Sequence, residues 1–211
     1  EGEPFLVNDG IQGPSRAPAV AMDADGNFVV AWEDLSGSSE GILIRLYEND
    51  SPEPLTLPYS VDAGIPDRLV SPEVAMDADG DFVVTWAGEG LDASRFGIQA
   101  RHFDADGTAT APSFSVNTFT DSDQRFPNIA MDADGDFEIA WRSYGQDGSN
   151  YGVYAQRFAS TPVANEDDAA LPTALALDTV FPNPARDAAT LRYTLPTSAD
   201  VRLAVTDVLG R

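Results

Sequence analysis

Short runs of alternating side chains dominate the first three quarters of the chain. In residues 28–32, FVVAW, the first, third and fifth side chains share one face of an extended strand, and the valine and alanine between them form a second apolar face. We therefore expect this strand to be covered on both sides. Residues 23–26, DADG, precede it, and in such a segment Asp favours the start of a type I turn. Gly favours the left-handed position that closes a short hairpin with a bulge. The pattern predicts a buried β-hairpin.

The same hairpin occurs three times. PAVAMDADGNFVVAW begins at Pro18, PEVAMDADGDFVVTW at Pro72 and PNIAMDADGDFEIAW at Pro127, so the prolines lie 54 and 55 residues apart. All three Met and all three Trp of the chain fall at equivalent positions of these copies. In the third copy Glu138 replaces a valine of the second apolar face, which predicts that the last unit is partly exposed there.

Two further β-rich runs flank each hairpin. FLVN at 5–8 is matched by YSVD at 59–62 and FSVN at 114–117, and the run from Gly41 to Tyr47 recurs at 97–103 and 152–158. Four runs per copy predict an all-β fold of three four-stranded, propeller-like blades over residues 1–159, divided at about 1–55, 56–110 and 111–159. A blade cannot cover its own faces, and propellers close with about four to eight blades. We expect either further blades upstream or an incomplete, open array.

These motifs resemble a known repeat. MDADGDFVVxW, followed by GQDGSxxGVYAQRF at 145–158, is similar to the β-propeller-like repeats of large secreted bacterial proteins. The resemblance covers residues 5–159. It implies an extracellular β-repeat array and assigns no activity.

The remainder of the chain has a different pattern. Residues 160–179 are rich in Ala, Pro, Asp and Leu without a sustained period, as expected of a linker. Residues 180–211 contain FPNP at 181–184, RYTLP at 192–196 and DVLGR at 207–211. This stretch resembles the opening of a type IX secretion C-terminal sorting domain, an immunoglobulin-like β-sandwich, of which it would form less than half. The resemblance implies a secreted or surface-anchored protein that engages the type IX secretion machinery; an immunoglobulin-like module of another kind is the alternative.

The charge balance narrows the possible partners. Asp and Glu number 35 against 12 basic residues, all of them Arg, for a net charge of −23. Such a surface repels nucleic-acid phosphates and anionic lipids, and no apolar run is long enough to insert into a bilayer. Adaptation to high salt and an ordinary acidic extracellular protein are both compatible with this composition. The lack of Cys excludes disulfides and thiolate chemistry.

The residue types offer little catalytic chemistry. His102 is the only histidine and falls where the other copies have Leu46 and Arg157, so we interpret it as a tolerated surface position. The alternating acids of the turns, such as Asp77, Asp79 and Asp81, could bind calcium, but their Gly stands fourth rather than sixth and no distal Glu follows, so a turn role is favoured. The three Trp are expected in the core rather than as sugar platforms. We assign no catalytic, cofactor or metal residue.

Elimination therefore favours a non-catalytic extracellular repeat module, used for binding, adhesion or structural display, with an unidentified glycan or protein as ligand. The alternative is an accessory part of an exported hydrolase whose catalytic domain or blades lie upstream. A binding face is expected on the variable loops at 33–40, 87–96 and 142–151, which carry Phe96, Tyr144 and Tyr151.

Overall fold

The computed structural model describes residues 3–36, 41–61, 68–90 and 95–159, and the backbone of residues 176–177 and 193–194. Residues 1–160 and 161–211 form two separate compact units. In the second unit β12 (Ala176–Leu177), inside the predicted linker, pairs antiparallel with β13 (Tyr193–Thr194). The other residues of the predicted immunoglobulin-like sandwich lie outside the described part. Among the described residues no helix is long and apolar enough to cross a membrane.

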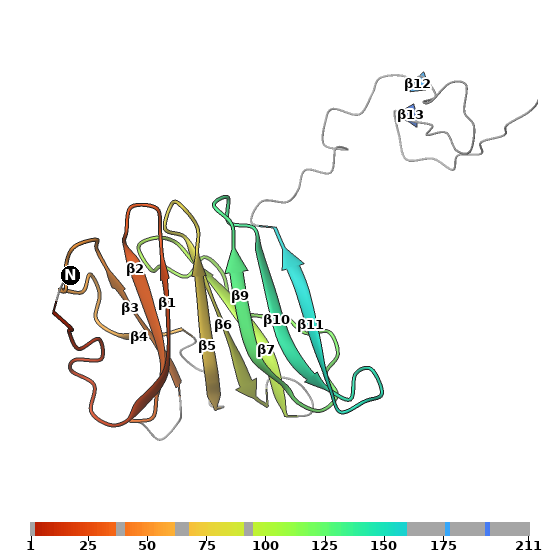
Figure 1. Ribbon diagram of the computed structural model, residues 1–211, viewed down its shortest axis with the longest axis horizontal. Helices are drawn as coiled ribbons and strands as arrows, with labels where there is room; N and C mark the ends of the chain where they lie inside the picture. Colours follow the sequence, from red (N-terminus) through yellow and green to blue (C-terminus); the bar gives the residue numbers. More distant parts are fainter. Residues whose placement is uncertain are drawn as a thin grey trace, which may run out of the picture. The chain divides into compact units, whose positions relative to one another are not determined.

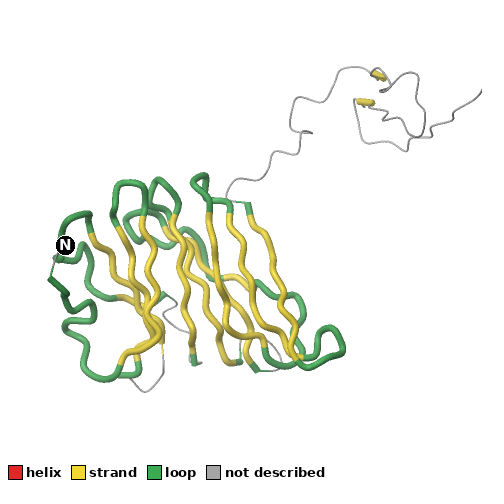
Figure 2. The backbone as a smooth tube through the Cα atoms, in the orientation of Figure 1, coloured by secondary structure: helices red, strands yellow, loops and turns green. Residues whose placement is uncertain are grey.

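The first compact unit consists of three antiparallel sheets that follow one another along the chain (Figure 1). Sheet I contains β1 (Ser15–Met22), β2 (Phe28–Asp34), β3 (Gly41–Tyr47) and β4 (Tyr59–Ser60). Sheet II contains β5 (Leu69–Met76), β6 (Phe82–Glu89), β7 (Phe96–Phe103) and β8 (Phe114–Ser115). Sheet III contains β9 (Gln124–Met131), β10 (Phe137–Tyr144) and β11 (Tyr151–Phe158). Connecting loops gather at the two ends of the strands (Figure 2).

The fourth strand of each complete sheet comes from the following repeat. Tyr59 pairs with Ile44 of β3, and Phe114 pairs with Ala100 of β7, so the run that opens a repeat completes the sheet before it. Two of the expected strands are therefore not found in the described part of the chain. Residues 5–8 are not a strand, and sheet III has three strands within the residues described, while the sequence has no further FxVN run after Phe158.

The hairpin turns have the predicted geometry. In the first, the Gly26 N–H donates to the Asp23 carbonyl at 3.3 Å, the Asp23 N–H donates to Asn27 at 2.9 Å, and Gly26 has a φ of 89°. The Asp23 carboxylate also accepts the backbone N–H groups of Asp25 and Asn27. Asp77 and Asp132 accept the corresponding pairs in the other two turns. The invariant first Asp and the Gly of DADG are therefore required by the turn itself.

Adjacent sheets pack face to face, most extensively through their first strands. β5 contacts β1 and β2 closely and β3 less, and β9 contacts β5 in the same way. Sheets that meet along their first strands and diverge toward their last strands form wedge-like, propeller-type blades, here in an open array. Between them lie two apolar cores, one joining sheets I and II around Ile44 and Trp86, the other joining sheets II and III around Ile98 and Trp141.

Equivalent aromatic side chains recur in every sheet. The prediction that the three Trp belong to the core is confirmed, since Trp32, Trp86 and Trp141 are all buried. The first residue of each second strand stacks on the last residue of the third strand. These stacked rings have centroid separations of 4.7, 5.0 and 4.9 Å in the pairs Phe28–Tyr47, Phe82–Phe103 and Phe137–Phe158. Offset stacking of this kind fixes the register of one strand on the next in each repeat.

The three sheets differ in the face that points toward the C-terminal end of the array. In sheets I and II this face is apolar and buried, as Val29 and Val83 show. In sheet III the equivalent residue, Glu138, is exposed, as the sequence predicted. Sheet III therefore presents to solvent the face that its two predecessors bury.

His102 lies at the junction of sheets II and III rather than on the open surface. It is half-buried, and its ring packs 5.7 Å from Phe114 and 5.1 Å from Phe137. Burial lowers the pKa of His102 below its ordinary value of 6.5. The expectation of a tolerated surface position is corrected by this packing, which favours the neutral imidazole.

A matched pair of substitutions measures the difference between the buried and exposed faces. Ile98 is 0% exposed and its equivalent Val153 is 83% exposed. We expect Ile98→Ala to lower the free energy of unfolding by about 2–5 kcal/mol, because it leaves a cavity in the core between sheets II and III. Val153→Ala should change it by less than about 0.5 kcal/mol. Urea unfolding of both variants checks this, and equal effects would contradict the assigned faces.

The packing of His102 predicts a pH dependence. Because its folded-state pKa is depressed, the stabilisation from the neutral ring is complete above pH 6.5 and declines as the pH falls through the folded-state value. His102→Leu, the residue present as Leu46 in the first copy, should remove this contribution. On acidification from neutral pH, the unfolding midpoint of the parent should therefore fall more than that of the variant. A difference between the two midpoints that stays constant with pH would argue against a buried neutral ring.

Candidate functional site

The outer face of sheet III is the largest departure from the repeat. It is formed by alternate side chains of β10 and β11, which the strand register places opposite one another. Its residues are Glu138, Ala140, Arg142, Tyr144, Tyr151, Val153, Ala155 and Arg157. At four of these positions sheet I has Val29, Glu33, Ile42 and Leu46, all buried. A charged and aromatic surface thus replaces a buried, mainly apolar one.

An aromatic group occupies the loop end of this face. Tyr144 and Tyr151 are the register pair at the ends of β10 and β11, and both are exposed. Their rings meet edge to face, with centroids 5.0 Å apart. The Arg142 guanidinium lies 4.1 Å from the centre of the Tyr151 ring and 4.6 Å from that of Phe126. Two aromatic rings thus contact one planar cation, which holds all three side chains in place.

Phe126 sits in a strained backbone conformation. Its φ is 55°, in the left-handed region, at a bulge where β9 changes register against β10. The equivalent residues Ala17 and Ser71 have φ values of 50° and 55°, so the bulge itself belongs to the repeat. Only in the third copy does a bulky aromatic residue occupy it, and there the side chain is 56% exposed. The backbone strain is therefore common to all three copies, and the exposed ring is what distinguishes the third.

The loop beside the aromatic group is ordered by its own hydrogen bonds. The Gly145 N–H donates to Asn150 at 2.8 Å, and Gly148, with φ 81°, donates to the Gly145 carbonyl. The Asp147 carboxylate accepts the backbone N–H and the hydroxyl of Ser149 at 2.9 and 2.7 Å. These two bonds hold the pKa of Asp147 below its ordinary value. The loop therefore presents Tyr144 and Tyr151 from a fixed turn.

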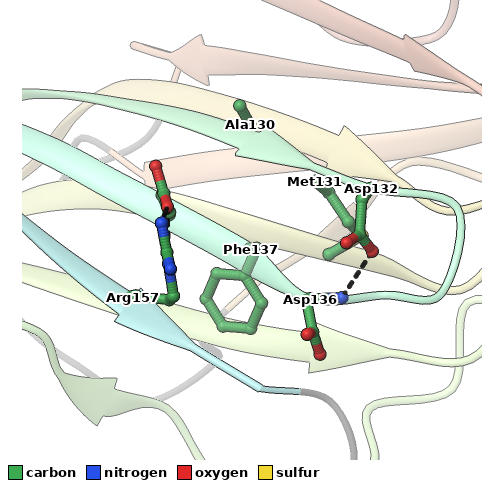
Figure 3. A pocket seen from close by; sticks show the side chains of 7 residues that line it. Ala130, Met131, Asp132, Asp136, Phe137 and Arg157 are labelled. Atoms are coloured by element: carbon green, nitrogen blue, oxygen red, sulfur yellow. Dashed lines mark hydrogen bonds and ion pairs between the residues drawn. The ribbon is translucent and has the colours of Figure 1, made fainter. Parts of the chain in front are cut away.

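A hollow of about 370 Å³ lies at the opposite end of the same face, beside the third DADG turn (Figure 3). It is lined by Ala130, Met131, Asp132, Asp136, Phe137, Glu138 and Arg157. Arg157 donates through Nε to Glu138 Oε1 at 2.6 Å and through Nη2 to the same oxygen. Because both side chains are exposed, this pair adds little stability and keeps polar groups available at the rim of the hollow.

Related hollows lie beside the other two turns. One is lined by Asp81, Phe82 and His102 together with Met131 of sheet III, and another by Asn27, Phe28 and Leu46 together with Met76 of sheet II. In both, the following sheet supplies one wall. Of these three hollows beside the turns, the described residues bound the one of sheet III by a single sheet, so a ligand could reach it from the open face.

The turn carboxylates are engaged within the fold. Besides the bonds of Asp23, Asp77 and Asp132 to their own turns, Asp81 accepts the N–H of Ala105 at 2.9 Å. Asn27 accepts the N–H of Asn49 in the same way. Among the described residues, no three His, Cys, Asp or Glu side chains group closely enough to hold a metal ion. These contacts account for the first Asp of each turn and for Asp81.

The loops in which a binding face is expected lie partly outside the described residues, at 37–40 and 91–94, and their described aromatic residues differ in exposure. Tyr144 and Tyr151 come together on an exposed face, whereas Phe96 is buried in the core between sheets II and III, where Arg125 covers its ring at 3.7 Å. The sequence reasoning missed Phe126 and Arg142. The signal was present in the alignment of the copies, because Phe126 replaces Ala17 and Ser71, and Arg142 replaces Glu33 and Ala87.

No protein-family model matches the sequence, and no curated protein is significantly similar to it. Among solved structures, the fold resembles an endo-arabinase from Bacteroides thetaiotaomicron, with 12% identity and a TM-score of 0.48 over 70% of this chain and 57% of that one. It also resembles a Hadza microbial sialidase, with 14% identity and a TM-score of 0.48 over 69% and 38% of the two chains. A fucose lectin from Kordia zhangzhouensis has 18% identity and a TM-score of 0.37 over 67% and 99%. This chain spans less than two thirds of the endo-arabinase and of the sialidase, and likeness at this level assigns no ligand or activity to it.

Proposed function

We propose that this chain is a non-catalytic extracellular module that binds a neutral glycan on the outer face of sheet III. The observation that carries the proposal is the exposed aromatic group of Phe126, Tyr144 and Tyr151 around Arg142. A solvated end sheet requires only polar side chains. Three exposed aromatic rings, one of them at a position that holds Ala17 and Ser71 in the other copies, exceed that requirement.

The chemistry of the face suits a sugar chain. Aromatic rings offer flat apolar surfaces for the C–H faces of a sugar, and the tyrosine hydroxyls and the guanidinium can exchange hydrogen bonds with sugar hydroxyls. The small side chains Ala140 and Ala155 separate the aromatic group from the hollow beside Glu138 and Arg157. An extended ligand could therefore lie along the sheet, with its apolar faces on the rings and its hydroxyls at the ion pair.

The net charge restricts the class of glycan. With 35 acidic residues against 12 basic ones, the protein repels polyanions over distances comparable to the screening length. The positive charge of the two outer-face arginines is partly offset, for Arg157 by Glu138 and for Arg142 by the faces of two aromatic rings, although both side chains still reach solvent. Neutral polysaccharides are thus favoured over uronate-rich or sulfated ones.

The cellular location of the protein is proposed from the sequence. FPNP at 181–184 and DVLGR at 207–211 support a type IX sorting tail, hence a secreted or surface-anchored protein, and the high acidity and lack of Cys suit an extracellular setting. Within such a protein the module would attach the cell or a neighbouring domain to a glycan. The second candidate, an accessory part of an exported hydrolase, uses the same face to hold substrate for a catalytic domain elsewhere.

Removal of single rings tests the binding face. We expect Tyr151→Ala and Phe126→Ser each to weaken binding of a neutral polysaccharide roughly 2- to 10-fold, since one stacking contact contributes about 0.5–1.5 kcal/mol. Calorimetry or retardation in gels containing neutral or anionic polysaccharides measures this. Leu57→Ala, an exposed apolar residue outside the face, is the matched control. Phe126→Ser installs the residue of the second copy, so its fold should persist; unchanged affinity in both ring variants would remove this face from the proposal.

A turnover assay tests whether the chain itself is catalytic, which neither candidate function, binding module or accessory part of a hydrolase, requires. The chain should bind without releasing reducing ends from any polysaccharide it retains. Glu138→Gln, which keeps the shape of the only outer-face carboxylate, should leave that null result unchanged. Hydrolysis by the parent chain that is lost in Glu138→Gln would overturn the non-catalytic assignment.

A further inference from the structure

The opening segment, residues 5–8, occupies the place of a fourth strand although it pairs with no sheet. Its Val7 carbonyl accepts a hydrogen bond from Arg45 Nη1 of sheet I at 2.7 Å. The equivalent Val61 carbonyl accepts one from Arg101 Nη1 of sheet II, also at 2.7 Å. Phe5 packs 5.4 Å from Tyr47, as Phe114 packs 5.5 Å from Phe158. The fourth strand of sheet I lies against sheet II, and the fourth strand of sheet II lies against sheet III. The opening segment lies against sheet I in the same way.

In the two complete junctions this segment also pairs backward. Tyr59 and Ser60 form a ladder with β3, and the Val61 N–H donates to Ile42 at 3.1 Å. Phe114 to Val116 repeat these contacts with β7. In residues 5–8, the backbone edge that pairs with a third strand in the other two copies forms no strand ladder, and Leu6 is exposed. The segment is therefore a strand donor positioned for a sheet on its other side.

The face of sheet I beside it is apolar. Its central part, with Val30, Trp32 and Tyr47, is buried in a small cluster that includes Val7, but its margin along β1 is uncovered. Val20 is 63% exposed, whereas its equivalent Val74 is 7% exposed in the core between sheets I and II. Met22 is also exposed, whereas Met76 packs against that core. A hollow of about 220 Å³, lined by Val7, Asn8, Ser15, Arg16, Pro18, Val30 and Trp32, lies on the same face. These are positions that a preceding sheet covers in sheet II.

The two ends of the array are not equivalent, and this identifies the occupant. A sheet that covers Val20 and Met22 must present an apolar second face, as sheets I and II do with Val29 and Val83. Sheet III presents Glu138 and Arg157 instead, whose burial against apolar residues would cost more than their mutual attraction returns. Gln156 also replaces the arginine that reaches the fourth-strand region in the other copies, Arg45 and Arg101. Sheet III is thus built as a terminal sheet.

We propose that the opening segment and the exposed face of sheet I form a docking surface for one further four-stranded sheet of this same repeat. The third strand of that sheet pairs with residues 5–8, and its apolar second face covers Val20 and Met22. Sheet III is the cap of the array, so growth is possible at the N-terminal side alone. This inference is independent of the proposed glycan binding.

An added repeat tests the proposal directly. Residues 15–58, which contain β1 to β3 and end in Pro58, are duplicated and joined to Phe5 in place of residues 1–4, which also end in Pro. The longer chain should unfold at higher temperature and urea concentration and bind less of an apolar dye than the parent. The matched control carries V29E and L46R in the added copy alone, which gives its second face the polar residues of sheet III, and should lose most of the gain. Equal midpoints for parent, longer chain and control would overturn the proposal.

A substitution at Val20 supplies a second readout. In the parent, Val20→Thr should leave the unfolding midpoint nearly unchanged, while Val74→Thr lowers it clearly. In the longer chain, the original Val20 becomes buried, so its replacement by Thr should then lower the midpoint as Val74→Thr does. A Val20→Thr variant that stays silent in a stably folded longer chain would show that the added sheet does not cover this face.

Light scattering of the parent chain distinguishes the other possible occupant, sheet III of a second copy. The polar outer face of sheet III predicts a monomer over a wide range of concentration. A stable dimer that dissociates on Leu6→Asp but persists in a surface control, Leu57→Asp, would place a second copy on the docking surface and overturn the choice of occupant.

Discussion

The architecture depends on one constraint, that a β-sheet with two apolar faces must be covered on both. The central strands β2 and β6 carry large apolar residues on one face and mainly Val and Ala, with Thr85 and Glu33, on the other, and nearly all of them are buried. Each sheet therefore requires a neighbour before and after it, and burial of this apolar area is the dominant favourable term for the array. An array of such sheets can end only at a sheet whose second face is stable in water. In this chain that sheet is sheet III, where Glu138 and Arg157 form an exposed ion pair.

The fourth strands link neighbouring sheets through the backbone. Because the run that opens one repeat closes the sheet of the previous repeat, the polypeptide crosses every junction and pairs on both sides of it. Val61 and Val116 are buried in the cores that these crossings seal. Tyr59 extends the link, since its hydroxyl donates at 2.8 Å to the carbonyl of Gly107, in the turn that follows β7. Burial, with a smaller contribution from Asp106, raises the pKa of Tyr59 to about 12. Neighbouring sheets are thus joined by backbone and side-chain hydrogen bonds as well as by apolar contacts.

The outer face of sheet III is free of this constraint. Once no further sheet has to pack there, positions that hold Val29, Glu33 and Leu46 in sheet I can change to Glu138, Arg142 and Arg157. The same release allows an exposed aromatic group around Arg142 at one end and an open hollow at the other. Under the proposed function, sheet III combines the roles of cap and recognition surface, since both require a face that is stable in water.

The sequence by itself determined the local structure of this protein. The turns follow from Asp and Gly at fixed positions, the buried faces from the period-two pattern of FVVAW, and the exposure of sheet III from Glu138, because each of these depends on a residue's own backbone preference and polarity. Only the tertiary structure decided which sheet each strand joins, since FxVN pairs backward with a strand about 15 residues earlier and nothing in its composition states that choice. It also decided that Phe96 is buried while Phe126 is exposed, and that Arg142 unites rings from β9 and β11. These outcomes depend on contacts between residues distant along the chain, which a pattern of nearest neighbours does not contain.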